Sequence, residues 1–336
     1  MTNRERLRRT LAGDCRVDRL PMIEWVDWWD VTLARWKEED PALPRGRVPL
    51  MEHFGLDSYH HYWLQIRKAG IPTAAYHGAP IFSGESDFRR NVLPYLFDTS
   101  HFLPLREALL KSKPLHDAGD VFVWYTLEGF FWFPRTLWGI ENHLYAFYDA
   151  PELMQEVNEK LVDFHIRSLE VLYDVLTPEF MSFAEDMSYN HGPMLSKVCF
   201  DAMLLPCYRK IVSLIRAQGT KVFIDTDGNV EPLMPWFQAA GIDGVLPLER
   251  QAGVDIRRIR EQYPDWLMIG GYDKTVMHHG ESAMRAEFER VLPAMRNGRY
   301  IPSVDHQTPP DVSVAQYRVY VALLQEYARR AVEDKP

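Results

Sequence analysis

From about residue 120 onward, short apolar runs alternate with segments of helical periodicity, and this alternation constrains the fold more than any other feature. The segment that begins at Pro151 is typical of an amphipathic helix, because Leu153, Val157, Leu161 and Phe164 recur at spacings of four, four and three. Regular alternation of strands and helices predicts a parallel α/β architecture. The predicted strands are residues 121–127, 180–184, 222–224, 244–248, 267–270 and 300–304.

Two earlier apolar runs, residues 21–25 and 73–82, bring the predicted strands to about eight, the number that a (β/α)8 TIM barrel requires. An open doubly wound sheet is the alternative. It is disfavoured because no strand is followed by a GxGxxG turn, and the pair Gly270 and Gly271 is too short to bind a pyrophosphate. We therefore predict one barrel domain over residues 1–336, with a helical extension and the first strand in residues 1–70.

Composition and charge exclude several classes of function. The formal net charge is -9, and no dense stripe of Lys and Arg follows the short segment 4–9, which argues against a nucleic-acid partner. No run of about 18 apolar residues exists, and the N-terminus is charged where a secretory signal has to be apolar. We therefore expect no membrane association and a cytoplasmic location.

Acidic residues follow seven of the predicted strands. In a barrel the active site lies at the carboxyl ends of the strands, so these side chains are expected to share one mouth. Like charges that meet there raise the free energy unless a cation, a shared proton or a substrate compensates them, and this cost favours a functional site. The strand-end residues are Glu24, Asp27, Glu128, Glu185, Asp186, Asp225, Asp227, Glu249, Tyr272, Asp273, Lys274, Asp305 and His306.

Asp225 and Asp227 end one hydrophobic strand at positions i and i+2, so they are expected to project to the same side. One of them then needs a raised pKa or a positive partner, which a metal, Lys274 or the substrate can supply. Helix capping is the alternative interpretation of each acid taken singly, above all of Asp227, Asp273 and Asp305.

His306 follows another strand and suits general acid/base chemistry or metal binding, although a lone histidine is more often structural. His60 and His61 have no acidic neighbours at ligand spacing, and we expect them at the surface or at a helix end.

With these positions in place, the chain resembles the uroporphyrinogen decarboxylase superfamily over nearly its whole length. The family fold is a (β/α)8 barrel whose cleft lies at the strand carboxyl ends, in agreement with the prediction above. The order and spacing of several segments together carry the resemblance. They are TNRER (2–6), DRLP (18–21), AEDMSYNHGPMLS (184–196), DGNV (227–230), GIDGVLPLE (241–249), GGYDK (270–274) and VDHQTPPDVS (304–313).

The superfamily contains decarboxylases of an octacarboxylate tetrapyrrole and corrinoid-linked methyltransferases, and this chain departs from both. The decarboxylases clamp substrate carboxylates with arginines after the first strand, whereas residues 22–29 read MIEWVDWW here. Thiol-activating methyltransferases hold zinc with a His-x-Cys pair and a later Cys. This chain has Asp225-Thr226-Asp227 and a later Asp305-His306, so its harder oxygen ligands suit a different metal or none.

The resemblance favours an enzyme that transfers a methyl group from a small methylated substrate to a corrinoid carried by a partner protein. The alternatives are a decarboxylase of a tetrapyrrole or smaller acid, which needs no cofactor, and a non-catalytic small-molecule binder. The resemblance also implies a homodimer.

We predict Asp225, Asp227, Glu249 and His306 as catalytic residues. Asp225, Asp227 and His306 are in addition the candidate ligands of a divalent metal, zinc or a similar ion. The predicted substrate-binding residues are Glu24, Trp28, Glu128, Glu185, Asp186, Tyr189, Tyr272, Asp273, Lys274 and Asp305.

Overall fold

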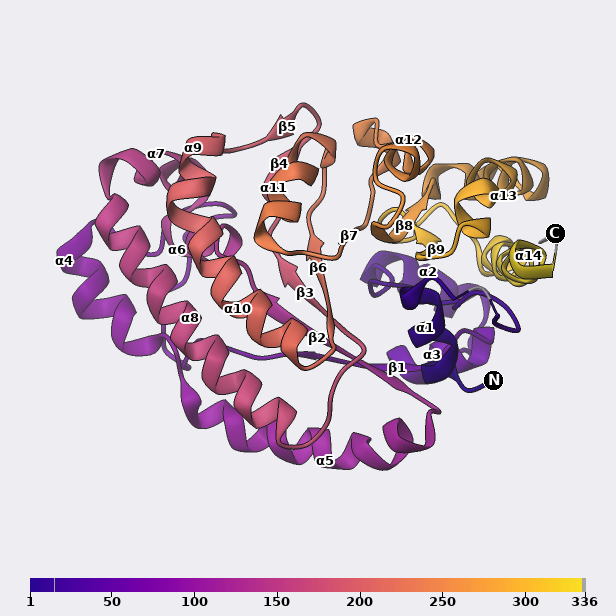
Figure 1. The fold of residues 1–336 in the computed structure, drawn as a ribbon, viewed down its shortest axis with the longest axis horizontal. Helices are drawn as coiled ribbons and strands as arrows, with labels where there is room; N and C mark the ends of the chain where they lie inside the picture. The colour runs from indigo at the N-terminus through magenta and orange to yellow at the C-terminus, as the bar shows by residue number, and fades with distance from the viewer. Residues whose placement is uncertain (15, 334–336) are drawn as a thin grey trace.

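The computed structural model describes residues 1–14 and 16–333, so Cys15 and the last three residues of the predicted domain lie outside the described part. Within these residues the core is a curled sheet of seven parallel strands, with helices on its outer side (Figure 1). The strands pair in the order β1-β2-β3-β6-β7-β8-β9. They are β1 Tyr59–Trp63, β2 Phe122–Glu128, β3 Phe180–Ala184, β6 Lys221–Asp225, β7 Gly244–Leu246, β8 Leu267–Tyr272 and β9 Tyr300–Val304.

The strands read as apolar runs because both faces of the sheet are covered, which is typical of parallel sheets. Every residue of β3 and of β9 is buried. The register places Glu128 opposite Ala184 and Ala184 opposite Asp225, so the carboxyl ends of β2, β3 and β6 are level. Polar residues that follow these strands therefore emerge at one edge of the sheet.

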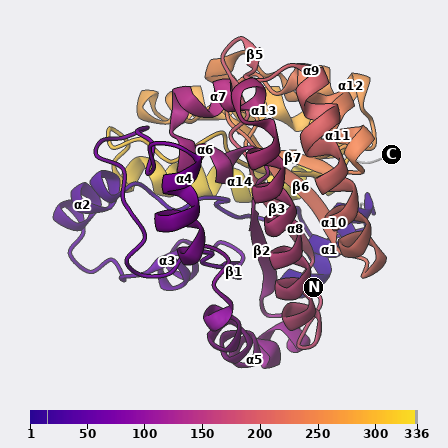
Figure 2. The ribbon, with the colours of Figure 1, turned by 90° about the vertical axis from the view of Figure 1, so that its left-hand side faces the viewer.

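Helices connect successive strands and cover the sheet, as a parallel α/β architecture requires. In Figures 1 and 2, α8 and α10 lie side by side on the outer side of β2, β3 and β6, and Figure 1 shows α13 and α14 beside β8 and β9. The helices are α1 Asn3–Ala12, α2 Asp30–Glu39, α3 Arg47–Phe54, α4 Glu85–Asp87, α5 Phe102–Ala118, α6 Trp132–Trp138, α7 Ile140–Asp149, α8 Pro151–Tyr173, α9 Lys197–Cys199, α10 Leu205–Ala217, α11 Met234–Ala240, α12 Ile256–Gln262, α13 Glu281–Arg296 and α14 Val314–Glu333.

Shorter elements occupy the loops between these helices and strands. A small antiparallel hairpin after β3 pairs β4 with β5. The short elements are β4 Ser188–Tyr189, β5 Gly192–Pro193, η1 Phe88–Val92, η2 Leu93–Tyr95, η3 Thr99–His101, η4 Phe200–Leu204, η5 Glu231–Leu233, η6 Arg250–Ala252 and η7 Lys274–His279.

None of the helices within residues 1–14 and 16–333 combines the length and the apolarity that crossing a bilayer requires.

The helix predicted from the spacing of apolar residues is confirmed as α8. Pro151 is its first residue, where a missing backbone N–H costs nothing. Leu153, Val157, Leu161 and Phe164 are all buried along one side. The six strands predicted after residue 120 are also present, with ends that shift by up to two residues.

The strand predicted at residues 73–82 is wrong, because this segment is a loop. Gly78 adopts a φ of 81° there, a conformation that breaks a strand. The first strand is instead β1, whose histidines are not surface residues. His60 Nδ1 lies 2.6 Å from Ser112 Oγ, and His61 Nε2 lies 2.8 Å from Thr126 Oγ1 of the neighbouring strand.

Residues 21–25 do not form the predicted strand, but they lie between the two edge strands. Asp57 N donates to Met22 O at 2.7 Å just before β1, and Trp25 Nε1 donates to Val304 O at 2.8 Å at the end of β9. The segment thus takes the place of an eighth strand without strand pairing. Since β1 and β9 are not paired with each other within the described residues, the closed (β/α)8 barrel stays a prediction.

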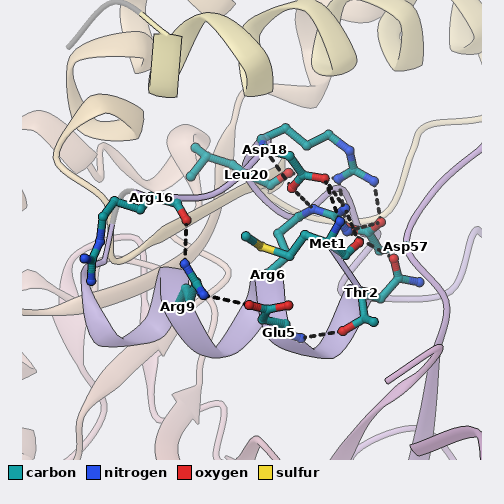
Figure 3. A network of polar contacts seen from close by, with 11 residues as sticks. Met1, Thr2, Glu5, Arg6, Arg9, Arg16, Asp18, Leu20 and Asp57 are labelled. Atoms are coloured by element: carbon teal, nitrogen blue, oxygen red, sulfur yellow. Dashed lines mark hydrogen bonds and ion pairs between the residues drawn. The ribbon is translucent and has the colours of Figure 1, made fainter. Parts of the chain in front are cut away.

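A buried ion-pair network attaches the helical N-terminal extension to the sheet. Figure 3 shows Arg6 of α1 between Asp18 and Asp57. Asp57 is 2% exposed, and its carboxylate accepts from Arg6 at 3.2 Å, from Arg19 at 2.5 Å and from Met22 N at 3.0 Å. Because Asp57 stands just before β1, this one carboxylate fixes α1 and residues 19–22 to the start of the sheet.

We predict that Asp57→Asn lowers the free energy of unfolding by about 3 kcal/mol, because two arginines lose their buried counter-charge. Urea denaturation of the purified protein measures this loss. Asp18→Asn is the matched control, since Asp18 contacts the same Arg6 at 2.8 Å but its side chain is 44% exposed. The control is expected to cost at most about 1 kcal/mol, and equal losses in both variants contradict this account.

Candidate active site

Acidic residues from β3 and β6 meet His306 at the carboxyl edge of the sheet. Asp225 ends β6 and Asp227 follows it, while Asp186 follows β3. His306 Nε2 lies 3.5 Å from Asp227 Oδ2. Burial raises the pKa of Asp225 well above its usual range, and the charges of Asp227 and Asp186 raise it further. The structure therefore brings these four predicted residues into one cluster.

Asp225 differs from its neighbours because no donor or cation among the described residues contacts its carboxylate. Only its backbone oxygen is engaged, as acceptor for Glu185 N at 2.9 Å and Asp186 N at 3.3 Å. The pKa of Asp186 is also raised, by burial and by the charge of Asp227, but Arg135 opposes this shift. The side chain of Asp225 is partly exposed, so its carboxylate is accessible at the edge of the sheet.

His306 lies against two tryptophans and carries a raised pKa. The hydrogen bond to Asp227 raises the pKa of His306, while partial burial acts in the opposite direction. Its ring meets Trp25 edge-on at 6.2 Å and Trp29 at 6.4 Å between centroids. Trp29 remains 38% exposed, so part of the residue next to the imidazole is accessible.

Glu249 supports the loop that carries Asp227. Its Oε2 accepts from Gly228 N at 3.0 Å. Gly228 has a φ of 79°, and a Cβ there would lie 2.6 Å from the backbone of Tyr189, so the position requires glycine. Asn229 N donates to Tyr189 O at 2.9 Å, which fixes the loop against the β4–β5 hairpin. Glu249 and the Tyr189 backbone thus fix the loop that carries Asp227. The Tyr189 side chain itself is half exposed.

Lys274 neutralises Asp305 rather than the acids of the cluster. Its Nζ lies 3.3 Å from Asp305 Oδ1, and both side chains are buried. The Asp305 carboxylate also accepts from Arg250 N at 2.8 Å and Lys274 N at 3.1 Å, so it joins the loops after β7 and β8. Asp273 caps η7 through Thr275 N at 2.9 Å, which is the capping role considered for it.

Four predicted substrate-binding residues are engaged by other parts of the protein. Glu24 accepts from Tyr317 at 2.8 Å and Trp28 packs against Trp36 and Tyr317, while the Tyr272 hydroxyl donates to Met284 O at 3.2 Å.

Glu185, the fourth, binds backbone N–H groups at the start of α6. Glu185 and Asp186 both follow the end of β3, and their contacts separate them: Glu185 binds the start of α6, whereas the charge of Asp186 acts on Asp225.

Sequence reasoning missed the arginines that approach the strand-end acids. Arg135 Nη1 lies 3.4 Å from Asp186 Oδ2, and Arg47 Nη1 lies 2.9 Å from Asp27 Oδ1. Burial raises the pKa of Glu128 to about 7, and the charge of Arg67 opposes this shift. These arginines lie in helices and loops, where no spacing marks them as partners of a strand end.

A metal site at Asp225, Asp227 and His306 is expected from the sequence. No group of three or more His, Cys, Asp or Glu side chains in the described part of the chain is placed to hold a metal ion. Asp227 Oδ2 and His306 Nε2 contact each other directly, so a metal would bind through the other oxygen and the other ring nitrogen or would replace this contact. Metal binding by Asp225, Asp227 and His306 stays a prediction.

Comparison with known proteins identifies the family. The sequence profile of the uroporphyrinogen decarboxylase (URO-D) family matches residues 135–327, more than half of the chain. The chain belongs to the uroporphyrinogen decarboxylase family. This confirms the resemblance drawn from the sequence segments, and the matched region contains β3, β6, β7, β8 and β9 with the acids that follow them.

Solved structures of similar fold accompany this URO-D match. A methyltransferase from Methanosarcina mazei has a TM-score of 0.64 at 16% identity, over 97% of this chain and 99% of that chain. A Listeria monocytogenes protein assigned as a vitamin-B12 independent methionine synthase has a TM-score of 0.47 at 11% identity, over 95% and 97%. The first similarity shows the fold alone. No curated protein sequence matches the chain.

We predict that the pKa of His306 lies above 6.5 and falls on Asp227→Asn, because the hydrogen bond to Asp227 stabilises the imidazolium. Histidine NMR titration of both proteins measures the difference. A raised pKa means that this pair stabilises the fold fully below about pH 6.5 and less as the pH rises through the folded-state value. The same pKa in both proteins contradicts the pairing.

We predict that Asp225→Asn stabilises the protein at pH 8 by on the order of 1 kcal/mol, because it removes a carboxylate flanked by two others. The pKa of Asp225 in the folded state exceeds the reference value of 3.8, so its ionisation costs stability as the pH rises above about 4. Urea denaturation at pH 8 and pH 5 is expected to show a smaller gain at pH 5. The exposed Asp201, paired with Lys197, supplies the control Asp201→Asn, and a gain no larger than in this control contradicts the account.

Proposed function

We propose that this chain is a methyltransferase that moves a methyl group from a small methylated substrate to a corrinoid carried by a partner protein. The unpartnered carboxylate of Asp225, beside the His306–Asp227 pair, is the observation that carries the proposal. Membership of the uroporphyrinogen decarboxylase family and the fold shared with a methyltransferase support it. The proposed substrate bears a positive charge or a hydrogen-bond donor at the atom that holds the methyl group.

Asp225 is proposed to bind this atom, because the acidic cluster attracts cations and disfavours anions. The exposed face of Trp29 beside His306 offers a second contact for a methylated cation. When the carbon–heteroatom bond breaks, the electron pair stays on the heteroatom of the leaving group. The reduced corrinoid supplies the nucleophile that accepts the methyl group.

His306 is proposed to give its proton to the lone pair that remains on that heteroatom after the bond breaks, since the direction of its pKa shift favours the imidazolium. Asp227 holds the ring through Nε2 and stabilises the imidazolium. Glu249 keeps the Asp227 loop in place through Gly228. In this scheme Asp186 completes the acidic wall opposite His306.

Decarboxylation of a carboxylic acid is the less supported alternative. A substrate carboxylate needs a cation to hold it, but Lys274, the cation among the predicted substrate-binding residues, is bound to the buried Asp305. The acidic cluster repels the same anion. The homodimer and the divalent metal implied by the family resemblance stay predictions, and metal analysis of protein purified without chelator tests the latter.

We predict methyl transfer to free cob(I)alamin, kept reduced with titanium(III), from at least one of the two cationic donors tetramethylammonium and trimethylammonium. The loss of cob(I)alamin absorbance measures the rate. Asp225→Asn and His306→Gln are each expected to lower kcat/KM by about 100-fold, because each removes a group at the reacting atom. Asp201→Asn, which changes an exposed carboxylate paired with Lys197, is expected to keep the full rate.

Two results contradict this proposal. One is a parent protein that demethylates none of the donors, and the other is full activity in Asp225→Asn. Binding of a methylated cation without turnover by the parent protein indicates instead the small-molecule binder considered from the sequence.

A further inference from the structure

Glu185, the first of two consecutive acids after β3, anchors the beginning of helix α6. Its Oε1 accepts from Phe130 N at 2.7 Å, and its Oε2 accepts from Phe131 N at 2.8 Å and Trp132 N at 3.1 Å. The Tyr208 hydroxyl binds the same carboxylate. These N–H groups have no partner within the helix, so a buried carboxylate is well suited to this place. Glu185 therefore fixes α6 to the end of β3.

Asp186, the second acid, is also bound by helix α6, but through the side chain of Arg135 rather than through backbone N–H groups. Arg135 of α6 donates from Nη1 to the Asp186 backbone oxygen at 3.0 Å and lies 3.4 Å from its Oδ2. The guanidinium also stacks over Trp132, 5.2 Å from the ring centroid. Asp186 has a φ of 47°, in the left-handed region that residues other than glycine rarely adopt. The Arg135 contact to the backbone oxygen holds this strained conformation in place.

We propose that Arg135 is a positioning residue that keeps the Asp186 carboxylate in the mouth beside Asp225 and Asp227. Without it, the left-handed backbone can relax and repulsion among the three acids drives Asp186 outward. Arg135 forms an ion pair with Asp186, and His306 forms one with Asp227. Asp225 is therefore the acid that remains available to a ligand. Its role toward a substrate rests on the proposed function, but the positioning itself is a property of the free protein.

The protonation of His306 reports where the Asp186 carboxylate lies. Asp227 and Glu249 favour the imidazolium, Lys274 disfavours it, and Asp186 and His306 act on each other through their charges. If Arg135 acted on His306 only through its positive charge, removing Arg135 would raise the pKa of His306, because a nearby cation disfavours the imidazolium. If Arg135 positions Asp186, its removal takes a carboxylate away from the mouth and lowers that pKa.

Histidine NMR titration of the full chain compares Arg135→Gln, Asp186→Asn and the double variant. We expect the pKa of His306 to fall in Arg135→Gln by as much as in Asp186→Asn, with no further fall in the double variant. Arg106→Gln is the matched control, because Arg106 forms an exposed pair with Asp174 at 3.0 Å outside the cluster. The control is expected to leave the titration unchanged.

A raised or unchanged pKa of His306 in Arg135→Gln overturns the proposal. Should that variant not fold, Arg135→Lys carries the test, since lysine keeps the charge but lacks the planar fork that reaches two acceptors. We expect an intermediate fall in Arg135→Lys, and the parent value there also overturns the proposal. Absence of methyl transfer in the parent protein contradicts the proposed function and leaves this comparison unaffected.

Discussion

Repulsion among carboxylates that share one edge of the sheet is the constraint on which the site depends. The parallel register makes the ends of β2, β3 and β6 level, so side chains distant in sequence emerge together. Three of these acids have a counter-charge nearby, whereas no donor or cation within the described residues contacts the carboxylate of Asp225. The pairs are Asp186 with Arg135, Asp227 with His306 and Asp305 with Lys274. Strand β6 ends at Asp225, and Asp227 follows it. Asp227 is paired with His306, whereas Asp225 remains available to a ligand.

The rest of the molecule holds this arrangement in place. Glu185 and Arg135 connect α6 to the end of β3, and Glu249 fixes the loop after β6. On the other side of the sheet, residues 21–25 fill the gap between β9 and β1, and Asp57 attaches them together with α1. Among these contacts the buried Asp57 is the one whose loss leaves buried charges without a partner.

The sequence was sufficient to predict most strands, the helix α8 and the presence of an acidic cluster, because these depend on local periodicity and on strand ends. It failed at β1, where two histidines in YHHYW hid a strand whose polar groups are satisfied by Ser112 and Thr126. It also did not separate Glu185 from Asp186, since both follow the end of β3 and the left-handed backbone of Asp186 has no signal in the sequence. Arg135 carries no sequence signal, because its pairing depends on how α6 packs.

The measurement that tests the central claim most directly is an NMR titration of aspartate side chains labelled with ¹³C at the carboxyl carbon, with Asp225→Asn to assign the resonance. The account predicts that the pKa of Asp225 lies above the reference value of 3.8, and that removing the charge of Asp186 or Asp227 lowers it. A pKa at or below that reference, unmoved when either neighbour is neutralised, contradicts the claim that Asp225 stands without a partner among like charges.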